Sequence, residues 1–218
     1  MLKVSQLSCE RDERLLFHNL SFQLSPGDVL QIEGRNGAGK TTLLRIIAGL
    51  SSHARGDIFW NDLPLSSVYA DFRLASFFLG HKPGVKMDLS PLENMHWRLQ
   101  LKNIQPVESV LFAALGQVGL YGYEDIPCSH LSAGQLRRVT FACLIASKAK
   151  LWILDEPFTA IDIDGVAWLE SLIDEHATNG GMVLITSHQP LSDHKGNLRK
   201  LKLEDFAGDA LEVFDDEY

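Results

Sequence analysis

The sequence predicts an α/β fold in which helices cover a parallel sheet, and two stretches of the chain carry this prediction. Residues 29–33 read as a strand that leads through a glycine-rich segment into residues 41–48, whose apolar side chains recur at helical spacing. Residues 151–154 form a short, continuous hydrophobic run, which is typical of a central parallel strand covered on both faces. The carboxyl ends of such strands are where an open α/β sheet binds its ligands.

The glycine-rich segment fits a phosphate-binding loop. Residues 34–41 read GRNGAGKT, which matches the pattern GxxxxGK[ST]. Small residues let backbone N–H groups approach a polyanion closely, and the following helix presents the positive end of its dipole to the same ligand. We expect Lys40 to reach the β and γ phosphates and the Thr41 hydroxyl to ligate Mg²⁺. The predicted nucleotide-binding residues are Gly34, Arg35, Asn36, Gly37, Ala38, Gly39, Lys40, Thr41 and Thr42.

Two adjacent carboxylates follow the apolar run 151–154. Asp155 and Glu156 would stand at the carboxyl end of a buried strand, which faces the ligand crevice of the sheet. An ordinary solvated strand end is the alternative, but a phosphate loop earlier in the chain favours a catalytic pair. We predict that Asp155 holds Mg²⁺ and that Glu156 acts as the general base toward the attacking water.

A second anion site is predicted where residues 131–135 read LSAGQ. Ser132 and the small residues after it start a helix, and a helix N-terminus can accept phosphate. Because the chain has one phosphate loop, we interpret this segment as the site for a nucleotide held by a second copy. Ser132, Gly134 and Gln135 would then contact that nucleotide in an antiparallel dimer that encloses two nucleotides. A capped helix start without a ligand is the alternative.

These motifs, in this order, resemble those of the ATP-binding cassette (ABC) ATPases over nearly the whole chain, with Ala133 where that family usually has glycine. The resemblance implies an ABC-type nucleotide-binding domain of the P-loop NTPase class, with an antiparallel β subdomain and an inserted helical subdomain. It also implies ATP and Mg²⁺ as ligands and ATP hydrolysis as the activity. His188, after the strand predicted at 182–185, resembles the family's switch histidine, which contacts the γ-phosphate and the catalytic carboxylate.

Three shorter strings resemble one branch of this family, the ATP-binding subunits of haem exporters in cytochrome c maturation. They are residues 9–17, 79–84 and 131–139. This resemblance implies a homodimer that is peripheral to the cytoplasmic side of the bacterial inner membrane and works with membrane-embedded permease subunits. Its work would be haem export or release of a haem-loaded chaperone. The alternatives are an ATPase for another ABC exporter, a soluble ABC protein of DNA repair or translation, and a nucleotide sensor that hydrolyses slowly.

Two positions depart from the ABC pattern. Arg11 takes the place of the aromatic residue that usually stacks on adenine; a guanidinium plane also stacks on a base, with weaker selectivity for adenine. The glutamine that usually orders Mg²⁺ and water is absent, since no glutamine occurs between Thr41 and Leu99. Lys82 takes its place by comparison with the haem exporters, but a protonated lysine cannot ligate Mg²⁺. His81 is the alternative substitute.

The composition bounds the class of protein. A chain of 218 residues with 45% hydrophobic residues is expected to form one domain with a good core. It has no apolar run of membrane-spanning length, and its start does not read as a signal peptide. The net charge of −8 argues against nucleic acid as a partner. Cys9, Cys128 and Cys143 lack metal-ligand spacing, so we expect reduced, partly buried thiols.

The predicted organisation is a single ABC ATPase domain over residues 1–218. Residues of about 1–76 and 149–204 would form the core with the β subdomain, about 86–148 the helical subdomain, and 205–218 a solvated acidic tail. By resemblance to the family, a groove between the sheet and the helical subdomain receives a short helix of the membrane subunit. The local candidates for this contact are Phe77, Phe78, His81, Pro83, Val85, Trp97 and Leu101.

Overall fold

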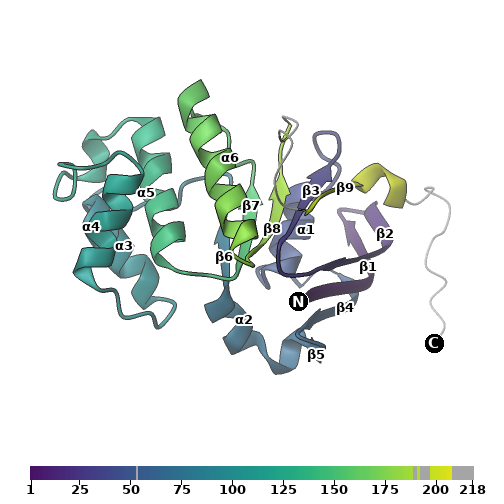
Figure 1. Ribbon diagram of the computed structural model, residues 1–218. Helices are drawn as coiled ribbons and strands as arrows, with labels where there is room; N and C mark the ends of the chain where they lie inside the picture. Colours follow the sequence, from purple (N-terminus) through teal and green to yellow (C-terminus); the bar gives the residue numbers. More distant parts are fainter. Residues whose placement is uncertain (53, 189–190, 192–196, 208–218) are drawn as a thin grey trace.

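The computed structural model describes residues 1–52, 54–188, 191 and 197–207, and a five-stranded sheet runs through the middle of the molecule (Figure 1). The strand order is β6-β7-β8-β3-β9, and every neighbouring pair is parallel. The strands are β3 (Asp28–Glu33), β6 (Ser76–Leu79), β7 (Leu151–Asp155), β8 (Met182–Thr186) and β9 (Asn197–Lys202). The predicted α/β fold with a parallel sheet is confirmed.

An antiparallel sheet in the order β2-β1-β4-β5 lies beside the parallel sheet (Figure 1). Its strands are β1 (Leu2–Arg11), β2 (Arg14–Leu24), β4 (Arg55–Trp60) and β5 (Leu63–Pro64). Asp12 and Glu13 close the β1–β2 hairpin with φ values of 51° and 59°, the left-handed conformation that a tight two-residue hairpin turn requires. The pairing of the two strands shifts at Asn19, so the buried Phe17 and Leu20 are three positions apart instead of two.

Six helices and three 3₁₀ turns are found in the described residues. They are α1 (Lys40–Ile47), α2 (Tyr69–Ala75), α3 (Pro91–Gln100), α4 (Glu108–Gln117), α5 (Ala133–Ala146), α6 (Ile163–Thr178), η1 (Leu65–Ser67), η2 (Cys128–His130) and η3 (Leu203–Phe206). Helices α3, α4 and α5 pack together on the side away from the antiparallel sheet (Figure 1). No helix within the described part of the chain is long and apolar enough to cross a membrane.

The parallel sheet separates two hydrophobic cores. Every residue of β7 and β8 is buried, as their continuous hydrophobic runs predict. Successive side chains of a strand point to opposite faces. Trp152 and Leu154 therefore join the core under α3, α4, α5 and α6, whereas Leu151 and Ile153 join the core shared by α1 and the antiparallel sheet. This arrangement fixes β7 in the centre, so the residue at its carboxyl end is held firmly.

Some expectations for individual side chains were wrong. Phe77, a candidate for the permease contact, is 2% exposed and lies in the core, because it points under the helices from β6. All three cysteines are fully buried rather than partly buried, as small apolar side chains in the two cores. Phe206, near the start of the predicted tail, lies in η3 and packs against the core beside the antiparallel sheet. Residues 208–218 of the predicted acidic tail lie outside the described residues.

Candidate active site

The phosphate loop connects β3 to α1, and only glycine suits the position that caps α1. Gly39 caps α1 with a φ of 102°, and a Cβ atom there would lie 3.1 Å from the Cβ of Leu16. Lys40 folds its side chain back over the loop, where its Nζ donates to the carbonyl oxygens of Gly34 (2.6 Å) and Arg35 (3.3 Å). The ammonium group and the N-terminus of α1 thus favour an anion at the same place.

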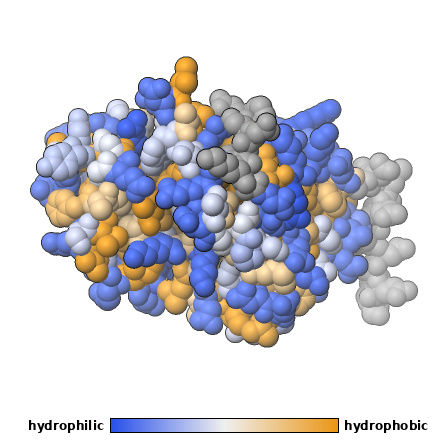
Figure 2. Space-filling view, in the orientation of Figure 1, coloured by the Kyte–Doolittle hydropathy of each residue, from blue (hydrophilic) through white to orange (hydrophobic). Residues whose placement is uncertain are grey.

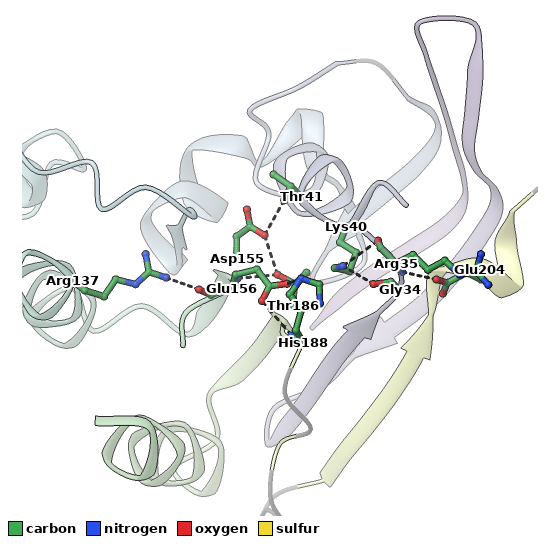
Figure 3. Close-up of polar contacts among 10 residues, drawn as sticks. All are labelled: Gly34, Arg35, Lys40, Thr41, Arg137, Asp155, Glu156, Thr186, His188 and Glu204. Carbon is green, nitrogen blue, oxygen red and sulfur yellow. Dashed lines mark hydrogen bonds and ion pairs between the residues drawn. The ribbon is translucent and has the colours of Figure 1, made fainter. Parts of the chain in front are cut away.

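Asp155 joins three elements at the carboxyl edge of the sheet. Its Oδ1 accepts hydrogen bonds from the hydroxyl of Thr41 at 3.0 Å and from the hydroxyl of Thr186 at 2.9 Å (Figure 3). Thr41 belongs to α1, Thr186 ends β8, and Asp155 ends β7 and is 1% exposed. Carboxylate and hydroxyl oxygens are the donors that Mg²⁺ prefers, so Asp155 and Thr41 fit the predicted metal.

Glu156 follows Asp155 and turns its carboxylate toward His188. The Nε2 of His188 lies 3.4 Å from Glu156 Oε1, and the backbone N–H of His188 donates to Oε2 at 3.3 Å (Figure 3). Glu156 has a φ of 47°, and its own N–H donates to the Thr186 hydroxyl at 3.0 Å. The left-handed backbone redirects the chain after β7, so that two neighbouring carboxylates point to different partners.

A cavity of about 660 Å³ brings most of the predicted residues together. It is lined by Arg11, Asp12, Arg14, Leu16, Arg35, Asn36, Gly37, Gly39, Lys40, Thr41, Thr42, His81, Glu156 and His188. Its volume lies within the range of sites for small organic ligands. Four of the lining side chains are arginine or lysine and two are acidic, so the cavity attracts anions although the chain as a whole carries a net charge of −8.

The residues at the two departures from the ABC pattern differ in their positions relative to this cavity. Arg11 reaches its rim from the β1–β2 hairpin, with a side chain that is 65% exposed and lies 3.5 Å from Asp12. Its guanidinium plane is therefore open to a base on the outer side of the phosphate loop. His81 lines the cavity, whereas Lys82 is not among its lining residues. Of the two alternatives for the missing glutamine, the geometry favours His81.

The LSAGQ segment stands apart from the cavity of its own chain. Ser132 caps α5, where its hydroxyl accepts from Gln135 N–H at 3.3 Å and its own N–H donates to Gln135 Oε1 at 2.9 Å. Ser132, Gly134 and Gln135 do not line the cavity around the phosphate loop. Gln135 thus stabilises the helix start, and the exposed Ser132 lies outside the nucleotide site of the same copy.

Three residues of the site escaped the sequence analysis. Thr186 bridges Asp155 and the Glu156 N–H, as described above. Glu204, in η3, accepts from the N–H of Arg35 at 2.6 Å, and this hydrogen bond holds the pKa of the Glu204 carboxyl below its usual value. The third residue is Arg137 in α5, which donates to the backbone carbonyl of Glu156 at 3.0 Å (Figure 3). Arg137 lies within the string 131–139 and Thr186 stands two residues before His188, but only the tertiary structure shows that these two residues and Glu204 contact the site.

A phosphate loop between β3 and α1, with two carboxylates at the carboxyl end of β7 in the same sheet, defines a P-loop nucleoside triphosphatase. The sequence profile of the ABC transporter family matches residues 17–159. The CcmA cytochrome c biogenesis ATP-binding export protein of Saccharophagus degradans is 55% identical over 194 residues, which cover 85% of this chain and 86% of that protein. The CcmA of Vibrio parahaemolyticus is 50% identical, with 94% and 100% of the two chains covered. The chain therefore belongs to the ABC transporter ATP-binding family, within its CcmA group.

Solved structures agree with this assignment. A putative ABC transporter ATP-binding protein from Pyrococcus furiosus superposes with a TM-score of 0.82 at 26% identity, covering 95% of this chain and 99% of its own. The dimeric MJ0796, a bacterial ABC transporter cassette, gives a TM-score of 0.81 at 21% identity over 93% and 95% of the two chains, and this likeness concerns the fold alone. The predicted family and the ABC-type fold class are confirmed.

Glu204 gives a first test of how the phosphate loop is held. Glu204→Ala removes the acceptor of the Arg35 N–H, so the amide hydrogen of Arg35 should exchange with solvent roughly threefold to tenfold faster, since a hydrogen bond to an exposed carboxylate contributes modestly. Hydrogen exchange at pH 7 measures this, with Asp205→Ala in the same 3₁₀ turn as the matched control. Because the pKa of Glu204 is lowered, the parent protein should lose this protection as the pH falls through that pKa. Equal exchange in both variants would contradict the contact.

His81 and Lys82 give a second test. His81→Ala should lower kcat for ATP roughly tenfold, because an imidazole lining the cavity can order water or contact phosphate. Lys82→Gln should leave kcat within about twofold, as for an ordinary surface change. Steady-state phosphate release at saturating Mg-ATP measures both. A large change in kcat with Lys82→Gln and none with His81→Ala would show that position 82, and not His81, takes the role of the missing glutamine.

Proposed function

We propose that this chain is the ATP-hydrolysing subunit of a membrane ABC complex for cytochrome c biogenesis, where it powers haem export or the release of a haem-loaded chaperone. The observation that carries the proposal is the Glu156 carboxylate, held beside His188 at the cavity that the phosphate loop lines. The role in cytochrome c biogenesis is supported by relatives with that name, which are about half identical over most of this chain.

ATP binds with its triphosphate along the phosphate loop. Lys40 supplies a positive charge to the β and γ phosphates, and the N–H groups at the start of α1 complete the anion site. Arg11, at the rim, stacks on the base. Thr41 and Asp155 would hold Mg²⁺, which would neutralise charge on the phosphates when bound. Release of Thr41 from its hydrogen bond to Asp155 would free both oxygens for this role.

Hydrolysis uses Glu156 as the general base. One water O–H bond breaks, its proton passes to the Glu156 carboxylate, and the oxygen bonds to the γ-phosphorus as the bond to ADP breaks. His188, whose backbone and ring both face this carboxylate, contacts the γ-phosphate and orients the base. Glu156 lines the cavity that would hold this water.

A second copy completes the site. Ser132, Gly134 and Gln135 begin α5 outside the cavity of their own chain, so a nucleotide of another copy is the ligand they suit. In an antiparallel homodimer, each α5 N-terminus would face the γ-phosphate held by the partner. ATP then binds the closed dimer more tightly than the open one, and hydrolysis reverses that preference, which supplies work.

The partner is the set of membrane-embedded permease subunits, and the proposed location is the cytoplasmic side of the bacterial inner membrane. A surface that docks on a membrane subunit is expected to expose a patch of apolar side chains. Figure 2 shows hydrophobic residues reaching the surface over the helices α3 and α4, and Trp97, Leu101 and Phe112 are 36%, 56% and 43% exposed. Trp97 and Leu101 remain candidates for the permease contact, and nucleic acid is not a proposed partner.

Glu156→Gln tests the proposed chemistry. The amide cannot accept the water proton, so kcat should fall at least about 100-fold while ATP affinity is kept. A dimer trapped with ATP should appear on size exclusion. Glu108→Gln, an exposed carboxylate at the start of α4, is the control and should behave like the parent. Turnover by Glu156→Gln at the parent rate would remove Glu156 from the base role.

The same variants test the biological role. A strain lacking this chain should lose its c-type cytochromes, with haem stalled on its carrier, and haem staining of membrane proteins measures this loss. The parent chain and Glu108→Gln should restore the cytochromes, whereas Glu156→Gln should not. Normal c-type cytochromes in the deletion strain would point to a different ABC exporter.

A further inference from the structure

Arg137 connects two segments that follow neighbouring strands. It lies in the second turn of α5 and is 2% exposed. Its Nη1 donates to the carbonyl oxygens of Gly80 at 2.9 Å and His81 at 3.2 Å. Its Nη2 donates to the Glu156 carbonyl at 3.0 Å, and its Nε to that of Pro157 at 3.3 Å. One guanidinium thus holds the chain after β6 and the chain after β7 together.

Both sides of Glu156 are fixed by this arrangement. Its N–H donates to Thr186, and its carbonyl accepts from Arg137 (Figure 3). A left-handed φ of 47° is unfavourable for a residue with a Cβ atom, so the surroundings must hold it in place. The Glu156 carboxylate can meet His188 only while this backbone is maintained.

An arginine suits this position better than a lysine. Four acceptors on two chain segments match the planar fork of N–H groups, whereas an ammonium offers three donors from one point. Burial lowers the pKa of Arg137 to about 10, partly opposed by the nearby Asp155, so the cation persists at neutral pH. Burying a charged side chain is costly unless it is hydrogen-bonded. The hydrogen-bond acceptors of the Arg137 guanidinium are backbone carbonyls beside the site.

We propose that Arg137 is a positioning residue for ATP hydrolysis, which aims the Glu156 carboxylate and couples it to α5 and to the segment at His81. The inference rests on the proposed function, since it gives Arg137 a role through Glu156. Arg137 would also connect the catalytic base to the dimer interface. Its helix α5 is capped by Ser132, which meets the partner's nucleotide in the proposed mechanism. A shift of α5 on dimer closure would reach the catalytic base through one side chain.

Arg98 provides a matched comparison. It comes from α3 and donates to the backbone carbonyls of Phe78 and Pro83, both at 3.2 Å, so it holds the same segment that Arg137 holds. It too is desolvated, and burial lowers its pKa. Neither of these hydrogen bonds reaches Glu156 or Pro157. The two arginines therefore differ in the contact with the catalytic residue.

The test compares Arg137→Met with Arg98→Met, since Met keeps an unbranched stem and removes the guanidinium. Arg137→Met should bind ATP within about threefold of the parent while kcat falls about 100-fold, the loss that a 1 Å misplacement of a catalytic group can cause. Arg98→Met should keep kcat within about threefold. Titration calorimetry and single-turnover hydrolysis measure the two quantities. Parental kcat in a folded Arg137→Met, or equal kcat losses in both variants, would overturn the inference.

Arg137→Lys decides the question if Arg137→Met does not fold. The ammonium keeps the charge but spans one pair of carbonyls at a time, so kcat should fall about tenfold with unchanged ATP affinity. Parental kcat in this variant would overturn the inference. Glu156→Gln separates failure of the proposed base from failure of the positioning role. If it retains turnover, the proposed base fails; if it is inactive and Arg137 variants are not impaired, only the positioning role fails.

Discussion

The hydrogen bonds on one oxygen of Asp155 are the constraint on which the site depends. Thr41 of α1 and Thr186 of β8 both donate to Oδ1, which joins the phosphate loop to two strands of the parallel sheet. The burial of every residue of β7 on both faces leaves Asp155 little freedom to move. The backbone of Glu156, the next residue, is therefore also fixed in position. The Asp155 carboxylate and the Thr41 hydroxyl are oxygen ligands of the kind that suit Mg²⁺. In the proposed mechanism, phosphate binding, metal binding and base catalysis would therefore share this one anchor.

The sequence was sufficient for the parts of the site that the ligand itself dictates. A triphosphate needs a loop of small residues and a lysine in consecutive positions, so Lys40 and Thr41 were recognisable. Asp155 was recognisable because it directly follows the apolar run 151–154 in β7. Glu204 was not predictable, because it lies 169 positions from Arg35, whose N–H it accepts. Arg137 bonds only to backbone carbonyls in the contacts described, and carbonyls carry no sequence signal.

The structure also places Ser132 apart from the residues that share the cavity. Lys40, Glu156 and His188 face one cavity, whereas Ser132 caps a helix outside it. The role of Ser132 toward a partner's nucleotide stays a prediction. Arg137 lies between the two, since it sits one turn into the helix that Ser132 caps and holds the backbone of Glu156. If Ser132 meets a partner's nucleotide, contacts within one chain would thus join the proposed dimer interface to the proposed base Glu156.

Mixing two inactive variants tests the composite site most directly. Lys40→Ala disables the half that binds the triphosphate, and Ser132→Arg blocks the face offered to the partner. In a mixed dimer, one site combines the intact Lys40 and Glu156 of one copy with the intact Ser132 of the other. An equal mixture should recover about a quarter of parental ATP hydrolysis, because half of the dimers are mixed and each has one complete site. A mixture as inactive as either variant alone would contradict a site built from two copies.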